Sequence, residues 1–172
     1  MAFSFSVESL RLEKGSSMPL ELEGTLDPID LTRSEMKFPG PVRFEGQATN
    51  AGKHILVTGT AQAESVLTCD RCLEEYSMPL TVELLETFYR VDEAPAKEVL
   101  DDDARPYGLD DEIDLRESIE QGFLLQLPIK LLCSEECKGL CPQCGADRNK
   151  ASCQCPPQDD WGLGLLLRDL KE

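Results

Sequence analysis

Positive charge is scarce in this sequence. Its 172 residues include 17 lysines and arginines against 33 aspartates and glutamates, which gives a formal net charge of −16. Proteins that bind nucleic acid chiefly by neutralising phosphates carry an excess of basic residues. The deficit therefore argues against a general nucleic-acid-binding protein.

Long apolar stretches are missing as well. No window approaches the ~18 consecutive apolar residues that a membrane-spanning helix needs. Residues 1–15 contain neither a basic region nor the continuous apolar run of a signal peptide. We therefore expect a cytoplasmic protein that makes no contact with a membrane. At 41% hydrophobic residues the chain can still bury a core, so a folded domain is expected.

Histidine is nearly absent, and this limits the catalytic chemistry that the sequence supports. His54 is the only histidine, so a histidine-rich hydrolytic metal site or a Ser-His-Asp triad has at most one imidazole. No glycine-rich phosphate-binding loop occurs either. The sequence therefore predicts that the protein is not an enzyme and has no small-molecule substrate.

Cysteine, in contrast, is concentrated: six of the eight cysteines lie between residues 133 and 155. Nothing in the sequence directs the chain to an oxidising compartment, so metal binding is a better interpretation than disulfide bonds. One group, with the spacing of a self-contained tetrahedral site, consists of Cys141, Cys144, Cys153 and Cys155. The other four, which form a second site if one pair folds onto the other, are Cys69, Cys72, Cys133 and Cys137.

A different grouping stays open from spacing alone. In a split zinc ribbon, Cys69 and Cys72 would join Cys141 and Cys144, and the remaining cysteines would form a looser set. We predict two zinc ions per chain, because closed four-thiolate sites usually hold structural Zn²⁺, although iron would satisfy the same ligands. A redox role for Cys69 and Cys72 is disfavoured, because no predicted helix follows them to lower a thiol pKa.

Alternating apolar residues predict strands in the first ninety residues. The alternating sets are Phe3, Phe5 and Val7; Leu20 and Leu22; Val42 and Phe44; Ile55 and Val57; and Met78, Leu80, Val82 and Leu84. Glycine, proline and the turn at residues 50–52 separate these runs. We expect residues 53–67 and 76–91 to be paired neighbours, with Cys69 and Cys72 at the tip of their hairpin.

One amphipathic helix is predicted over residues 114–127. Asp114 has the character of an N-cap, Glu117 would complete a capping box, and Pro128 ends the helix. The apolar stripe predicted to face the core consists of Leu115, Ile119, Phe123 and Leu127. A second, short helix is expected near the C-terminus, with Trp161, Leu165, Leu166 and Leu170 as its apolar residues.

The expected fold class is therefore α+β. An antiparallel β-rich body, either a sheet or a half-barrel, would carry one main amphipathic helix, four-cysteine zinc knuckles and the short C-terminal helix. We divide the chain into a body at residues 1–132, a cysteine-rich region at 133–155 and a tail helix at 156–172, which together would form one integrated domain.

Half of the net charge lies in residues 92–114, which carry ten acidic residues against Lys97 and Arg105. Like charges in one segment repel each other, so we expect a solvated, extended loop. A dedicated binding arm is the alternative. Its candidate partner contacts are Asp101, Asp102 and Asp103.

Several motifs together resemble one known family. They are the segment 67–73 (LTCDRCL), residues 113–115 leading into 125–128, the segment 137–145 (CKGLCPQCG) with Asn149, and the pair Cys153 and Cys155. This combination resembles the YceD family, the large ribosomal RNA subunit accumulation proteins of bacteria and plastids. The likeness covers essentially the whole chain, with specific matches at the cysteines. Two departures, at residues 147–149 and at the tail residues 159–161, leave the cysteines untouched.

The resemblance implies a role in 23S ribosomal RNA accumulation and large-subunit assembly, with no established enzymatic activity. The favoured hypothesis is an assembly factor that contacts basic ribosomal proteins or a pre-ribosomal particle, because an acidic surface steers basic partners toward it. The alternatives are a metal- or thiol-based redox sensor and direct RNA binding by a zinc protein. An RNA contact would use Lys138, Arg148 and Lys150, which balance the acids near the cysteines.

Overall fold

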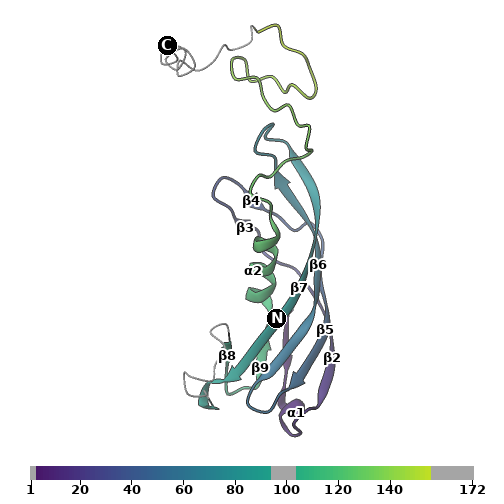
Figure 1. Ribbon diagram of the computed structural model, residues 1–172, viewed down its shortest axis with the longest axis vertical. Coiled ribbons are helices and arrows are strands. Elements are labelled where there is room, and N and C mark those ends of the chain that lie inside the picture. The colour runs from purple at the N-terminus through teal and green to yellow at the C-terminus, as the bar shows by residue number, and fades with distance from the viewer. Residues whose placement is uncertain (1–2, 94–103, 156–172) are drawn as a thin grey trace, which may run out of the picture.

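The computed structural model describes residues 3–93 and 104–155 of the chain (Figure 1). The elements in chain order are β1 (Ser4–Ser6), α1 (Glu8–Arg11), β2 (Ser17–Gly24), β3 (Ile29–Asp30), β4 (Glu35–Met36), β5 (Val42–Asn50), β6 (Ile55–Thr68), β7 (Glu75–Arg90), a 3-10 turn (Val91–Glu93), β8 (Arg105–Tyr107), β9 (Glu112–Asp114) and α2 (Arg116–Gln126). The expected tail helix and Asp101, Asp102 and Asp103 lie outside the described residues.

A five-stranded sheet with the order β2-β5-β6-β7-β8 forms the body. The first four strands are antiparallel, and β8 adds to the edge in parallel to β7. The predicted hairpin is confirmed, because β6 pairs with β7 from Ile55 opposite Phe88 to Thr68 opposite Glu75. The pair Cys69 and Cys72 follows directly at its tip.

The core lies between one face of this sheet and helix α2, which runs along β7 in Figure 1. Inward-facing strand residues such as Phe44 and Val57 are fully buried, as are Ile119 and Phe123 of the helix. The helix approaches the sheet closely at Gly122, where an added Cβ atom would lie 2.9 Å from a methyl carbon of Val82. The predicted core stripe of the helix is therefore confirmed, which establishes the α+β class.

The N-cap of the helix lies one residue later than predicted. Asp114 ends β9, where it pairs with Ser4 of β1, so the N-cap of α2 is Leu115, which makes no side-chain cap hydrogen bond. Asp114 Oδ1 accepts a hydrogen bond from the Arg116 backbone N–H at 2.9 Å. Glu117 forms no capping box in the described structure, since its carboxylate instead contacts the Arg105 guanidinium at 3.3 Å.

The interpretation of residues 92–114 as a solvated loop is wrong for its second half. Residues 105–107 and 112–114 form β8 and β9 and pair with the body. Between them, Asp111 adopts a left-handed conformation with φ of 56°. Its carboxylate lies 2.8 Å from an Arg11 nitrogen and 3.7 Å from an Arg90 nitrogen. Basic residues of the body thus hold the acidic segment in place here.

Candidate metal centre

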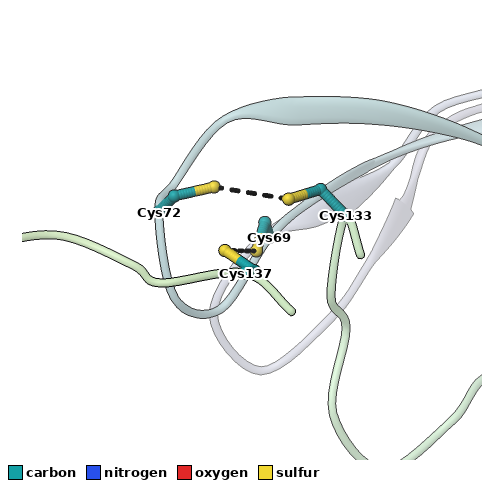
Figure 2. A group of neighbouring side chains, drawn as sticks. All are labelled: Cys69, Cys72, Cys133 and Cys137. Atoms are coloured by element: carbon teal, nitrogen blue, oxygen red, sulfur yellow. Dashed lines mark hydrogen bonds between the residues drawn. The ribbon is translucent and has the colours of Figure 1, made fainter. Parts of the chain in front are cut away.

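The first four-cysteine group begins at the tip of the β6–β7 hairpin. The Cys69 backbone N–H donates to the Glu74 carbonyl oxygen at 2.9 Å, and the Leu73 N–H donates to the Cys69 oxygen at 2.9 Å. Leu73 closes this tight turn with a φ of 60°. The turn brings the sulfurs of Cys69 and Cys72 to the same side of the chain (Figure 2).

The segment after α2 supplies the other two cysteines, and Asp70 attaches it to the hairpin tip. The Asp70 backbone N–H donates to the Leu131 oxygen at 2.7 Å, and its Oδ2 atom accepts from the Leu131 N–H at 2.8 Å. The Arg71 guanidinium adds a bond to the Cys137 carbonyl oxygen at 2.8 Å. These contacts bring Cys133 and Cys137 beside the hairpin across about sixty residues of intervening chain.

The four sulfurs of this group point toward one another in Figure 2. The Sγ atoms of Cys69 and Cys137 lie 3.8 Å apart, those of Cys72 and Cys133 lie 3.7 Å apart, and all four lie within 4.8 Å of one another. A tetrahedron of sulfurs about 2.3 Å from a zinc ion has edges of about 3.8 Å. A disulfide would instead need about 2.05 Å. The arrangement therefore fits a four-thiolate metal site formed by free cysteines.

Nearby N–H groups favour a thiolate at Cys69. Burial would raise the pKa of this thiol, but backbone N–H groups of Cys133, Cys72 and Arg71 outweigh burial and lower it to about 6. At Cys72, the backbone N–H of Glu74 lowers the pKa, but burial and neighbouring cysteines outweigh it and raise the pKa to about 12. The metal-free group thus holds at least one negative charge and at least one thiol proton at pH 7.

The second group forms on a small hairpin of its own. Leu140 and Asp147 face each other in an isolated bridge, and the Cys141 N–H donates to the Ala146 oxygen at 2.8 Å. Gly145 has the left-handed φ of 72° that this turn requires. Ligand sulfurs within 4.8 Å of one another belong to Cys141, Cys144, Cys153 and Cys155.

The pKa values of this group diverge as in the first one. Backbone N–H groups of Cys144 and Gln143 lower the pKa of Cys141 to about 6. The Cys144 side chain and burial raise the pKa of Cys155 to about 12. Each group therefore contains one cysteine with a lowered pKa and one with a raised pKa.

The structure brings the eight cysteines together in the two groups that spacing favours. A split zinc ribbon requires Cys69 and Cys72 to lie with Cys141 and Cys144. In the described residues they lie with Cys133 and Cys137 instead. The candidate RNA contacts Lys138 and Arg148 are exposed beside the groups. Lys150 is exposed as well, but its Nζ atom lies 2.6 Å from a Glu74 carboxylate oxygen.

Sequence reasoning missed the side chains that support these groups. Asp70 and Arg71 were recognised only as members of a motif, and Asn149 likewise. In the structure, the Asn149 side-chain N–H donates to Cys137 Sγ at 3.4 Å. Cysteine spacing carries no signal for such contacts, because it does not show which polar side chains the fold brings to the sulfurs. His54 is exposed in the turn before β6.

The comparisons with known proteins agree with the motifs. The family described as "Large ribosomal RNA subunit accumulation protein YceD" matches residues 57–166. The uncharacterised protein YlbN of Bacillus subtilis is 28% identical over 142 residues, which cover 80% of this chain and 79% of YlbN. An uncharacterised protein of Mycobacterium tuberculosis is 40% identical over 91 residues, or 53% of this chain and 44% of that protein.

A plant relative carries a functional name. The maize protein named large ribosomal RNA subunit accumulation protein YCED homolog 1, chloroplastic, is 40% identical over 58 residues, which cover 33% of this chain and 20% of that protein. The match thus spans less than half the length of the mycobacterial and maize relatives. No solved structure matches the chain. In the described residues, no helix has the length and apolar character needed to cross a membrane. Because the family model covers more than half of the sequence, the chain belongs to the YceD family of large ribosomal RNA subunit accumulation proteins.

Proposed function

We propose that both four-cysteine groups bind structural zinc, one ion each. The sulfur separations of 3.7 and 3.8 Å in the first group support this assignment, because they match the edges of a zinc–thiolate tetrahedron. Four protein thiolates fill the coordination sphere, so the ion would supply folding free energy rather than an open position for a substrate. At the first site it would cross-link the β-rich body to the cysteine-rich region in one integrated domain.

We further propose that the protein is a non-catalytic cytoplasmic factor for 23S ribosomal RNA accumulation and large-subunit assembly. It would act by binding a basic large-subunit ribosomal protein or a precursor particle that displays one, and its contact with RNA would be indirect. Family membership supports the general role. The choice of a basic partner rests on the charge of the sheet face that points away from α2.

Acidic residues form a row across that outer face. Glu21 of β2 lies directly opposite Glu45 of β5, Glu45 lies opposite Thr60 of β6, and Thr60 lies opposite Glu83 of β7. All three glutamates are exposed. Like charges in directly opposite positions destabilise a sheet. A partner that carries positive charge would relieve the repulsion between Glu21 and Glu45.

The charges around the cysteines disfavour direct RNA binding. A site of four thiolates and one Zn²⁺ has a net charge of about −2, so two loaded sites add negative charge beside Lys138 and Arg148. Lys150 is already paired with Glu74. A phosphate backbone would thus meet repulsion from both sites and from most of the remaining surface.

The test is an affinity purification of the tagged full chain from cells, with and without nuclease, followed by binding to purified components. We expect the protein to associate with large-subunit precursors and to keep its contact with a basic ribosomal protein after nuclease treatment. It should bind naked 23S fragments no better than an unrelated acidic control protein does. Tight binding to naked 23S RNA that weakens steeply with salt would refute the proposal. Partner binding that is lost when the thiols are oxidised and zinc is released, and that is restored by a reductant with zinc, would favour a redox sensor.

The matched variants change charge on different faces. The triple variant Glu21→Gln, Glu45→Gln and Glu83→Gln should weaken the protein contact and slow its association rate. A control variant removes the same number of acids elsewhere, at Glu8, Glu13 and Glu112, which are also exposed. Equal effects of the two variants would show that net charge, and not the outer sheet face, determines binding. Asp101, Asp102 and Asp103 can be replaced by Asn in the same assay to test the proposed binding arm.

A further inference from the structure

The two four-cysteine groups share a short piece of chain. Cys137 of the first group and Cys141 of the second are separated by residues 138–140 alone. The backbone of this linker is tied to the first group, because the Leu140 N–H donates to the Arg71 carbonyl oxygen at 3.0 Å. Any ion that orders one group therefore also orders a segment on which the other depends.

The linker is tied to the second group from its other side. The Arg148 N–H, on the small hairpin of that group, donates to the Gly139 oxygen at 2.9 Å. The next residue, Asn149, accepts from the Lys138 N–H through Oδ1 at 2.7 Å. Gly139 itself has a φ of 68°. The two hairpins and the linker thus form one hydrogen-bonded unit.

Asn149 also reaches a sulfur of the other group. Its Nδ2 atom donates to Cys137 Sγ at 3.4 Å and to Asp147 Oδ1 at 2.9 Å. An N–H donor stabilises the negative charge on a ligating thiolate and orients it, and such outer partners typically change metal affinity about 10- to 100-fold. The second group therefore positions a side chain that supports the first.

We propose that Asn149 is a positioning residue that couples the two metal sites, so that a zinc ion at either site raises the affinity of the other. The inference rests on the two zinc sites proposed above. Coupling between two binding sites is reciprocal, so loading of the first site strengthens the second by the same factor. At partial saturation, empty and doubly loaded chains would therefore be favoured over singly loaded ones.

The experiment is a zinc titration of the metal-free full chain, followed by native mass spectrometry. Independent sites of equal affinity give about half of the chains with one ion at half saturation, and independent sites of unequal affinity give more. We expect clearly fewer singly loaded chains in the wild type. Asn149→Ala should restore the singly loaded species and release one of the two ions about 10-fold faster to a chelator.

Two further variants test the N–H···S contact. Asn149→Asp keeps an oxygen acceptor for the Lys138 N–H but replaces the donor to Cys137 by a negative charge, so its zinc affinity should fall at least as far as that of Asn149→Ala. Ser152→Ala is the matched control, because Ser152 is exposed on the same segment, and it should load like the wild type. Circular dichroism of each variant verifies that the body is folded.

A double-mutant cycle links the contact to the second site. With Cys155→Ser, the second site loses a ligand, so Asn149 is no longer held in place and its replacement by Ala should have little additional effect on the first site. Wild-type chains that bind two ions independently, or an Asn149→Ala variant that loads like Ser152→Ala, would overturn the coupling. Failure of the wild type to bind two ions would instead refute the zinc sites themselves.

Discussion

Asp70 and Leu131 form a reciprocal pair of hydrogen bonds between segments sixty-one residues apart. The Asp70 N–H donates to the Leu131 oxygen at 2.7 Å, and the Leu131 N–H donates to Asp70 Oδ2 at 2.8 Å. Asp70 thus forms hydrogen bonds with both the backbone N–H and the backbone carbonyl oxygen of Leu131, which lies two residues before Cys133. The pair sets the position of the first metal site relative to the β6–β7 hairpin.

The carboxylate of Asp70 is therefore expected to be important for stability. Asp70→Ala leaves the nearly buried Leu131 N–H without its acceptor, which should reduce the free energy of unfolding by about 1–3 kcal/mol. Urea unfolding of the zinc-loaded protein measures the change. Asp70→Asn is the control, because its amide oxygen can accept the same hydrogen bond. Equal stability of the Ala variant and the wild type would contradict this role.

The two metal sites should respond differently to the loss of a ligand. Native mass spectrometry of the wild type should give two zinc ions per chain. Cys72→Ser removes the site that connects the hairpin to the chain beyond α2, and loss of structural zinc is loss of folding free energy. At saturating zinc, its melting temperature should fall well below that of Cys153→Ser, whose proposed partners are local in sequence. An equal fall in both variants, with both ions released, would argue against the proposed ligand sets.

Much of this architecture was predictable because it rests on local patterns. Alternation predicts β6 and β7, since inward residues such as Val57 and Leu80 must be buried. Cysteine spacing likewise favours the two groups. The start of α2 and the second half of the acidic segment were mispredicted for one reason. The strands β8 and β9 form only through pairing with β7 and β1, and sequence alone gives no measure of such long-range contacts.

Two glycines in the cysteine-rich region offer a matched comparison. Gly139 and Gly145 both have left-handed φ angles, of 68° and 72°. A Cβ atom at Gly145 would meet nothing within 4 Å, whereas one at Gly139 would lie 2.8 Å from the Arg71 carbonyl oxygen. Gly145→Ala should therefore cost about 1 kcal/mol of backbone strain, and Gly139→Ala clearly more.

The zinc affinity of the two variants measures the difference. Displacement of Arg71 in Gly139→Ala should disturb the first site as well as the linker, so zinc should be lost from both sites at lower chelator concentration. Gly145→Ala should weaken chiefly the second site, and the first site only through the coupling between the two. A Gly139→Ala variant as tolerant as Gly145→Ala would mean that the Arg71 contact does not constrain the linker.

Zinc uptake should release protons at neutral pH. In the metal-free protein, the pKa of about 6 makes Cys69 and Cys141 thiolates at pH 7, whereas the pKa of about 12 keeps Cys72 and Cys155 protonated. All ligand sulfurs must be deprotonated to bind, so each ion displaces at least one proton. Below about pH 6, Cys69 and Cys141 are protonated as well, and zinc affinity should fall more steeply. A pH indicator in weak buffer measures the release, and uptake without protons at pH 7 would contradict these ionisation states.

Glu45 should weaken the fold while it strengthens the partner contact. Its carboxylate lies on the outer face, directly across from Glu21, so Glu45→Gln removes a repulsion and should raise the free energy of unfolding by about 0.2–1 kcal/mol. The same variant should bind the basic partner more slowly, since the charge that steers association is reduced. Glu23→Gln is the control on the same face, because Glu23 is paired with Arg43 at 2.8 Å, and it should not stabilise the sheet. If Glu45→Gln were both no more stable and no slower to bind, the acidic row would have neither the cost nor the function assigned to it.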